Sequence, residues 1–530
     1  KGVKDLSVCE GKINAILPDM RVILIDCPRF TTGKKDSVTA LKDSEGNVLY
    51  DCSVQHIYPA GGAAHTWTAS GITLKGQGTS SEQYGASSRN LDIKCSNGFV
   101  FNDGKTSDTY SMTENSIGVN YFNIKVNVAS SENANNACLA DDYNTFQPYI
   151  RAARLANSKV RDTMEFHPCV IFVRESNPDI STHKEFADTN YHFYSCGDFG
   201  NSKKNHAAMG MDKTNPNECI VEIANNTDRI CLFKHDGTSF KANGLADYDT
   251  IFNWEGWGDA TDAQMEVGWH NSVEFRYPED FGLTDKNGKV WTEDEHKTSL
   301  IDSFKRLYTF IASTDTAAAT NATLEESVTY GETTYTVDSA EYRQAKFVNE
   351  FEEYMIKDSI LYHYLFTERH TMVDNRAKNT FWHTSDGIHW DLVFDYDNDT
   401  ADGNNNEGNL TLTFGMEDID KIGDGNVYNG ASIIGDADSC TLWANVRENM
   451  YDDLAALFKT LESKGAWDST RIINKFKAYQ SVKCRRLQMF DARRKYIRPY
   501  ENPNTLGGYT SNSAYFAMMY GLKELQRTLF

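Results

Sequence analysis

The chain has 530 residues, a length that corresponds to two to four packed units rather than one hydrophobic core. Hydrophobic residues make up 40% and aromatic residues 12%, with only ten prolines, so the composition argues against a disordered or fibrous protein. A formal net charge of −22 opposes contact with phosphate backbones and therefore argues against direct nucleic-acid binding. Such a charge is compatible with divalent cations, or with neighbours in an assembly that supply positive charge.

The cysteines do not form a recognisable framework, because the eleven thiols are scattered without a CxxC pair and their number is odd. We expect most of them to be reduced and packed, as Cys27, Cys169 and Cys231 lie in apolar runs. No stretch approaches the roughly 20 apolar residues of a membrane helix, so we expect no membrane insertion. The sequence opens on Lys1, which leaves a processed or truncated start open.

The first half of the chain is predicted to be rich in strands. Residues 1–60 alternate short apolar runs with turn residues, which predicts a small β module that ends near a PAGGAA segment at 59–64. Residues 61–283 then form a strand-rich region with one helix near residues 147–156. Its predicted strands lie at residues 71–76, 90–95, 121–128, 169–174 and 218–225.

The second half is predicted to be mainly helical. Residues 284–337, with a helix at 299–312, have the composition of a surface insertion. Asp338 or Ser339 can cap the next helix, and residues 338–408 form a helical lobe that carries an acidic segment. Residues 409–530 form a helical C-terminal region, with helices expected at 442–461, 471–497 and 514–529.

The acidic segment at residues 373–408 concentrates the candidate chemistry. Asp374 is followed five residues later by Asn379, and a Ser-Asp-Gly turn separates this pair from a strand-like WDLVF. Asp395, Asp397 and Asp399 stand at the exit of that strand. Phosphoryl transfer requires a carboxylate that orients the acceptor, together with an amide oxygen and a carboxylate on Mg²⁺. The order of these residues fits that requirement.

Two other interpretations of the acidic segment stay open. A solvated loop is naturally rich in Asp and Asn. Asp395, Asp397 and Asp399 also match the first three ligand positions of a calcium loop, but Thr400 and Asn406 replace its glycine and its glutamate. A regular EF-hand is therefore disfavoured, and an irregular Ca²⁺ site remains an alternative.

The run YDNDTADGNNNEG at residues 396–408, preceded by DNRAKN at 374–379, resembles the CotH kinase family, in the form found in virion proteins of tailed phages. Other segments follow in the family's order, namely KGQGTS at 75–80, SRNLDIK at 88–94, FNIKVNVASSENANNA at 122–137 and HPCVIFV at 167–173. The resemblance covers about residues 66–408, and its acidic end is the specific part.

The resemblance implies an α+β fold with an atypical protein-kinase-like, two-lobed core of the CotH type, extended by the N-terminal β module and the C-terminal helices. ATP and Mg²⁺, or Mn²⁺ or Ca²⁺, are the implied cofactors. Asp374 would orient the acceptor hydroxyl. The implied metal ligands are Asn379, Asp397 and Asp399, and the implied nucleotide-binding residues are Lys94 and Lys75, with Glu132 as a candidate partner of Lys94.

Two functions of different classes follow from this resemblance. The chain is either a Mg-ATP-dependent protein (Ser/Thr) phosphotransferase or a non-catalytic tail or neck protein that keeps the fold and a structural cation. The expected partners are other virion proteins or copies of the chain itself. The expected location is a phage virion, or the host cytoplasm during assembly, rather than a secreted or cell-surface site.

Three further features were weighed. Trp254, Trp257 and Trp269 could form a carbohydrate-binding or hydrolytic surface together with paired carboxylates, although core packing explains them better. The turn Gly-Asn-Ser-Lys-Lys at residues 200–204 could meet a phosphate, or could be a solvated turn. The histidines near the acidic segment show no metal-binding spacing, so we expect them to support other residues or to lie on the surface.

Overall fold

The computed structural model describes most of the chain between residues 20 and 481. The described ranges are 20–33, 36–77, 89–126, 134–150, 159–161, 163–177, 190–223, 274–314, 316, 323–330, 332–370, 372, 375, 379–393, 397–398, 401 and 441–481. Several predictions fall outside these residues. They concern Asp374, Asp395, Asp399, Glu132, Cys231, the three tryptophans at 254–269 and the helix at 514–529.

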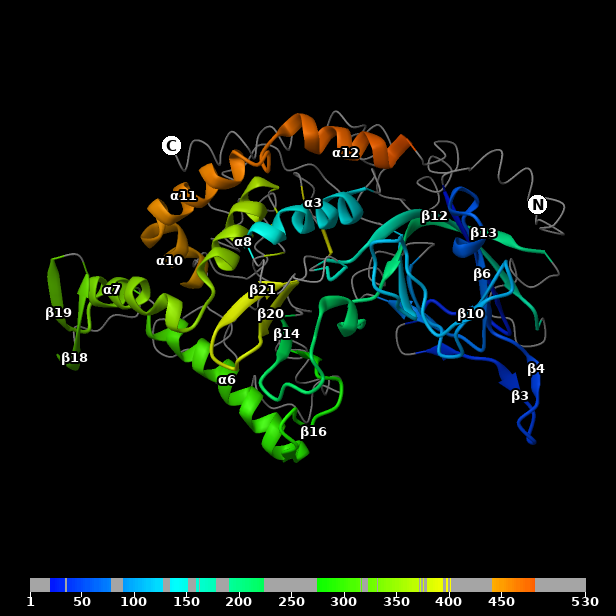
Figure 1. Ribbon diagram of the computed structural model, residues 1–530, viewed down its shortest axis with the longest axis horizontal. Coiled ribbons are helices and arrows are strands. Elements are labelled where there is room, and N and C mark those ends of the chain that lie inside the picture. Colours follow the sequence, from blue (N-terminus) through cyan, green and yellow to red (C-terminus); the bar gives the residue numbers. More distant parts are fainter. Residues whose placement is uncertain are drawn as a thin grey trace.

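The prediction of an α+β fold is confirmed. Strands of the first half build one large mixed sheet, which lies at the right of Figure 1. Most of the helices lie at the left, around a smaller sheet. The large sheet has the order β10-β9-β6-β5-β1-β12-β13-β11-β8-β7-β2. Its strands are β1 (Arg21–Cys27), β2 (Ser37–Val38), β5 (Ser53–Ile57), β6 (Trp67–Ser70), β7 (Thr73–Gln77), β8 (Asn90–Lys94), β9 (Phe99–Phe101), β10 (Thr106–Ser107), β11 (Tyr121–Lys125), β12 (Phe166–Glu175) and β13 (His192–Asn201).

The smaller elements complete the architecture. A four-stranded sheet has the order β15-β14-β20-β21, and three two-stranded hairpins lie apart from both sheets. The smaller sheet consists of β14 (Cys219–Ile223), β15 (Glu274–Tyr277), β20 (Thr380–Thr384) and β21 (Trp390–Val393), and the hairpins consist of β3 (Leu41–Lys42) with β4 (Val48–Tyr50), β16 (Leu283–Thr284) with β17 (Val290–Trp291), and β18 (Thr323–Tyr330) with β19 (Thr333–Val337). The α-helices of the described residues are α3 (Asn135–Ile150), α6 (Glu293–Ser313), α7 (Ala340–Glu350), α8 (Lys357–Arg369), α10 (Thr441–Asn449), α11 (Tyr451–Glu462) and α12 (Ser469–Ser481).

Strand β1 lies in the middle of the large sheet and is covered on both faces. Its apolar run places Ile23 and Ile25 in one core and Val22 and Leu24 in another. Because it is buried on both sides, it is apolar at nearly every position and pairs in parallel with β12. The sequence assigned β1 and β5 to a separate module of residues 1–60, whereas the structure places both strands inside the sheet that residues 61–283 complete.

The strands β7, β8 and β11 have one apolar face and one polar face. Leu74, Ile93 and Phe122 lie on the apolar face and are fully buried in the core of the large sheet. On the opposite face, the register aligns Lys75 with Asp92, and Asp92 with Asn123. Alternation along each strand therefore gathers polar side chains on the face away from that core.

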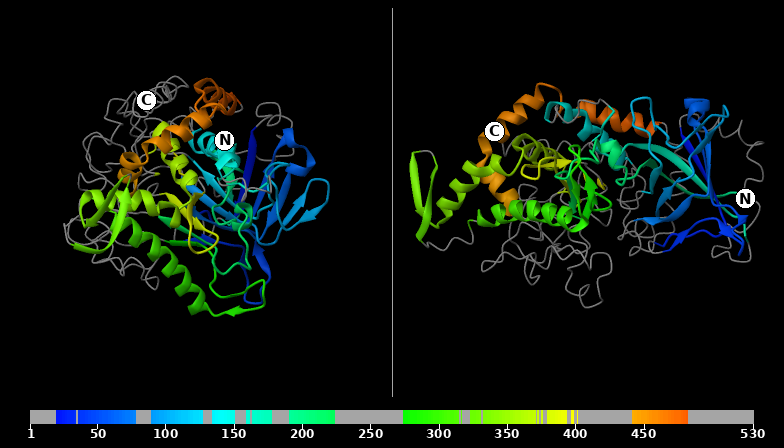
Figure 2. Two further views of the ribbon diagram at one scale, coloured as in Figure 1. Left: turned by 60° about the vertical axis from the view of Figure 1, so that its left-hand side comes forward. Right: turned by 60° about the horizontal axis from the view of Figure 1, so that its bottom comes forward.

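The helices share a second core with the smaller sheet. Helix α6 contributes Leu300, Phe304, Leu307 and Ile311, which recur on one face of the helix and are almost fully buried. This helix lies in the segment 284–337 that the sequence assigned to a surface insertion, so at least its helical part belongs to the core. The hairpin β18–β19 of the same segment lies at the far end of the molecule from the large sheet (Figures 1 and 2).

The predicted helix start at Ser339 is confirmed. Its side chain accepts a hydrogen bond of 3.2 Å from the backbone N–H of Tyr342 and caps α7. Helix α3 instead starts at Asn135, twelve residues before the predicted start at 147. Helix α12 reaches from the helical part toward the large sheet, where Tyr479 donates a hydrogen bond to Asp198 of β13 (Figure 1).

The described cysteines are free and buried, as expected. They are Cys27, Cys52, Cys95, Cys138, Cys169, Cys196 and Cys219. Burial raises the pKa of Cys52 and of Cys95 to about 12. Within the described ranges, no helix combines the length and the apolar character needed to cross a bilayer.

Candidate functional site

Asn379 and Asp397, two of the predicted metal ligands, share an unusual backbone conformation. Their φ angles are 57° and 61°, and they are the non-glycine residues with positive φ in the part of the chain that the structure describes. Asn and Asp tolerate this region better than other residues, but it still costs energy. Such outliers persist where the surrounding structure holds them, and they concentrate at functional sites.

Asp397 contacts a lysine that the sequence did not single out. Lys125, the last residue of β11, places its Nζ atom 3.0 Å from Oδ1 of Asp397. The lysine side chain is only 4% exposed, whereas that of Asp397 is 34% exposed. One end of Asp397 is therefore fixed from the large sheet, while the residue itself remains open to solvent.

A second carboxylate lies beside Lys125. The register of β11 and β13 places Asp198 directly opposite Lys125, so their side chains share one face of the sheet. Asp198 is completely buried and accepts a hydrogen bond from the hydroxyl of Tyr479 on α12. Burial, followed by the Asp198 charge, raises the pKa of Tyr479, which therefore stays protonated as a donor. Lys125 thus links the large sheet to Asp397, and Asp198 links the same sheet to α12.

Four buried asparagines hold the chain next to Asp397. Asn136 accepts a hydrogen bond of 2.7 Å from the backbone N–H of Asn398, and Asn375 donates one of 3.2 Å to the Asn398 side chain. Asn135 donates a bond of 3.4 Å to the carbonyl oxygen of Ala401. The first two residues of α3 therefore fix the segment that contains Asp397, which accounts for its defined backbone conformation.

The predicted nucleotide-binding lysines lie elsewhere on the same face of the sheet. Lys94 pairs with Tyr121 in the β8–β11 ladder, and Lys125 follows Tyr121 by four residues along β11. At the rise of a β-strand this corresponds to about 13 Å between Lys94 and Lys125. Lys75, on β7, is one strand further away. Lys125, rather than Lys94 or Lys75, is the lysine in contact with Asp397.

The histidines near the acidic segment support other residues, as expected. His383 is buried between two carboxylates, with Nδ1 2.8 Å from Asp391 and Nε2 3.0 Å from Glu218. His363 bonds the carbonyl oxygen of Asn375 at 2.8 Å and so steadies the asparagine network. None of these contacts has the form of a metal ligand set.

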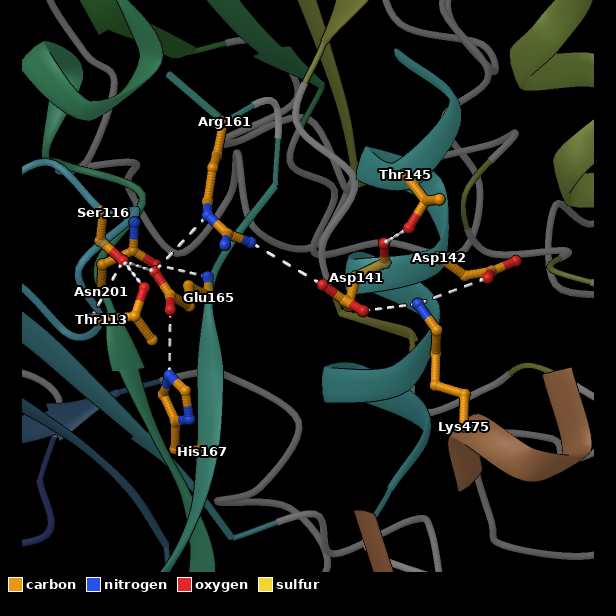
Figure 3. Close-up of polar contacts among 10 residues, drawn as sticks. All are labelled: Thr113, Ser116, Asp141, Asp142, Thr145, Arg161, Glu165, His167, Asn201 and Lys475. Atoms are coloured by element: carbon orange, nitrogen blue, oxygen red, sulfur yellow. Dashed lines mark hydrogen bonds and ion pairs between the residues drawn. The ribbon is translucent and has the colours of Figure 1, made fainter. Parts of the chain in front are cut away.

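A separate polar network surrounds Glu165 at the start of β12 (Figure 3). Ser116 donates to one oxygen of this carboxylate, and the Nε2 atom of His167 lies 3.0 Å from the other. Burial opposes ionisation of Glu165, but His167, Arg161 and Ser116 outweigh it and lower its pKa to about 2. A serine nucleophile and its histidine base must bond each other, whereas Ser116 and His167 each bond Glu165 instead.

The same network extends from the large sheet to the helices. Arg161 lies 3.5 Å from Glu165 and 3.8 Å from Asp141 on α3, and Lys475 of α12 bonds Asp141 at 2.5 Å (Figure 3). Asp142, next to Asp141, is also bonded by Arg471 of α12. These charges join the sheet to α3 and α12, and we assign the network to structure rather than to chemistry.

The residues around Asp397 suit a hard cation. Mg²⁺ takes oxygen ligands and keeps several waters, so a carboxylate and an amide oxygen suffice when phosphates complete the shell. In the described part of the chain, the side-chain oxygen of Asn135 is buried with no hydrogen-bond donor. Among the described residues, no three His, Cys, Asp or Glu side chains converge as a metal cage.

The sequence pointed to Asn379 and Asp397 but missed the residues that position them. Lys125, Asn135 and Asn136 lie in the segment 122–137 that was matched only to the approach of a helix. The Asn-Asn pair was a usable signal, because Asn favours helix starts. No protein-family model and no curated protein matches this sequence significantly.

Proposed function

We propose that the chain is a CotH-like kinase-fold protein of a phage virion with a Mg-ATP-dependent protein phosphotransferase site around Asp397. The proposal is supported by one coincidence above all. The sequence selected Asn379 and Asp397 as metal ligands without knowledge of their conformation, and both have positive φ. Non-glycine residues with positive φ are uncommon and concentrate at functional sites, although Asn and Asp adopt this conformation more readily than other residues.

Each residue of the site then has a distinct task. Bound Mg²⁺ would neutralise charge on the transferring phosphoryl group. Lys125 orients Asp397 through its 3.0 Å contact and offsets the negative charge of Asp397. Asn379 adds an amide oxygen. Asp374, on the resemblance alone, accepts the proton of the acceptor hydroxyl.

Calorimetry with ATP and either Mg²⁺ or Mn²⁺ tests this proposal. The wild type should bind ATP only with the metal present. Asp397→Asn keeps the size of the side chain and the preference for positive φ but removes the charge, so it should weaken metal-dependent binding at least about tenfold. Asp374→Asn should bind ATP normally yet fail to transfer phosphate. If the intact protein does not bind ATP under either metal, the phosphotransferase mechanism is wrong.

A non-catalytic virion component is the second candidate, and one surface feature favours it. The hairpin β3–β4 extends from the large sheet and exposes Val48 and Leu49 by 55% and 56% (Figure 1). Exposed apolar side chains on a projecting hairpin suit contact with other proteins. On this reading Lys125 and Asp397 only join two parts of the fold. Asp397→Asn would then lower stability in a protein that never binds ATP.

A further inference from the structure

A second cluster of charges lies on the polar face of the large sheet, away from Asp397. It consists of three lysines around one tyrosine, and we call Lys75, Lys94 and Lys204 the basic patch. Lys94 is exposed, whereas Lys75 and Lys204 are half-buried. Tyr121 lies between them. The patch is notable because the chain as a whole carries a charge of −22.

The strand register brings the basic patch together. Lys94 lies directly opposite Tyr121 on β11, and Lys75 lies opposite Asp92 on β8. Directly opposed residues share a face of a sheet, and diagonal neighbours lie about 7–8 Å apart. Lys75 and Lys94 are such a diagonal pair. The side chains of Lys75 and Lys94 therefore extend from the same face of the sheet as that of Tyr121.

Lys204 is held over Tyr121 from the other side. Its Nζ atom lies 3.3 Å from the tyrosine hydroxyl and 5.0 Å from the ring centre. The turn that carries it is fixed to the same residue, because the backbone N–H of Ser202 and the side chain of Asn205 both donate to the Tyr121 carbonyl oxygen, at 3.0 and 2.7 Å. This turn contains the Gly-Asn-Ser-Lys-Lys segment at residues 200–204, for which the sequence predicted a possible contact with phosphate.

The negative charge near the basic patch does not fully offset it. Asp92 is buried and is engaged by the hydroxyl of Tyr121 at 3.2 Å and by Asn123. Glu279 is 68% exposed and screened by solvent. Burial and then the neighbouring charge of Lys75 lower the pKa of Lys204, so the ammonium groups repel each other in the absence of an anion.

The basic patch is separate from the site at Asp397. Lys94 and Lys125 stand at opposite ends of the β8–β11 ladder, about 13 Å apart. Nucleotide phosphates must lie at the metal ligands, since the metal bridges them in phosphoryl transfer. The patch is thus left for another anion, and the remaining substrate of a protein kinase is the protein itself.

We propose that the basic patch binds acidic side chains of the phosphoacceptor protein, next to the site where its hydroxyl reacts. This inference rests on the proposed function for the identity of the ligand. The patch itself requires only that an acidic protein segment binds there. The three lysines around one aromatic ring match a run of carboxylates. The chain as a whole is negatively charged, so the rest of its surface would repel such an acidic segment.

Fluorescence anisotropy with a labelled hexaglutamate peptide tests the proposal in low salt, with hexaserine as the neutral control. The wild type should bind hexaglutamate, and added salt should weaken the binding. Lys94→Glu and Lys204→Gln should each weaken it about fivefold or more, as expected for loss of a charge contact. Lys286→Glu changes another exposed lysine on a distant hairpin and should leave the affinity within about twofold.

Parallel ATP titrations separate this inference from the proposed function. Lys125→Met should weaken ATP binding at least about tenfold and leave peptide binding unchanged, and Lys94→Glu should weaken peptide binding and leave ATP binding unchanged. If the protein binds the peptide through the basic patch but does not bind ATP, the proposed kinase function is wrong and the proposed docking site is supported. The docking site is overturned if hexaglutamate does not bind the wild type, or if the patch variants lose ATP instead of the peptide.

Discussion

Two lysines end neighbouring strands with nearly the same local sequence, Leu-Asp-Ile-Lys at 91–94 and Phe-Asn-Ile-Lys at 122–125. Nothing in either motif tells which lysine reaches Asp397. The antiparallel pairing of β8 and β11 decides it, because it sends Lys94 and Lys125 to opposite ends of the ladder. Which lysine contacts Asp397 therefore depends on the direction in which β8 and β11 pair, and the local sequence of either strand does not reveal that direction.

Replacing each lysine by methionine tests this assignment. Lys125→Met should weaken metal-dependent ATP binding at least about tenfold and lower the free energy of unfolding by about 1–2 kcal/mol, because Asp397 loses the ammonium group that contacts it. Lys94→Met should leave both quantities nearly unchanged. Calorimetry and urea unfolding measure the two effects. If Lys94→Met weakened ATP binding and Lys125→Met did not, Lys94 would be the nucleotide-binding lysine, as the resemblance implied.

The backbone of Asn379 allows its two roles to be separated. Alanine at a positive φ of 57° should destabilise the fold by about 1 kcal/mol more than glycine, which adopts this region freely. Both Asn379→Ala and Asn379→Gly remove the amide oxygen, so both should lose metal-dependent ATP affinity. If Asn379→Gly binds ATP as well as the wild type, the side chain is not a ligand and only the conformation matters.

At the scale of the element, Ser339 shows what local sequence can predict. Its hydroxyl caps α7 as expected, since it precedes an apolar helical face. Ser339→Ala should lower the free energy of unfolding by about 1 kcal/mol, whereas Ser339→Asp should retain the cap. Thermal unfolding followed by circular dichroism compares the three proteins. Equal stability of all three would mean that tertiary packing, not the cap, fixes the start of α7.

Local patterns predicted most of the described helices but fewer than half of the described strands, and non-local pairing limited the rest. The apolar run of β1 indicated a strand, but its parallel partner β12 lies more than 140 residues later, so residues 1–60 were assigned to a separate module. The helical face of α6 was visible, yet the polar composition around it suggested an insertion. At the candidate site, Asn379 and Asp397 followed from spacing, whereas Lys125 required the fold.

At the scale of the whole molecule, the core of the large sheet and the core of the helices are joined by polar contacts and by a smaller apolar cluster that includes Ala137, Phe166 and Phe381. One core fills the large sheet, and the other lies among the helices and the smaller sheet. The network around Glu165 crosses between them (Figure 3), and so does the contact of Tyr479 on α12 with Asp198 of β13. Because these links are ionic or buried and polar, the cohesion of the molecule should depend on pH.

The free energy of unfolding should fall steadily as the pH is lowered. Burial, followed by the charge of Arg276, lowers the pKa of His206 from 6.5 to about 4, and His contacts lower that of Glu165 from 4.5 to about 2. Both groups bind protons more readily when unfolded, so acid favours the unfolded state. Protonation of His206 should lower the free energy of unfolding between about pH 6.5 and 4, and protonation of Glu165 should lower it between about pH 4.5 and 2.

Urea unfolding across this range, with one variant for each window, tests the assignment. His206→Gln should flatten the loss between pH 6.5 and 4, which is on the order of 2 kcal/mol in the wild type. Glu165→Gln should reduce the loss below pH 4.5. His389, which is exposed on a turn, provides the control, and His389→Gln should follow the wild type. If His206→Gln loses stability as steeply as the wild type between pH 6.5 and 4, other buried histidines such as His56 carry the acid sensitivity, and the assignment to His206 is wrong.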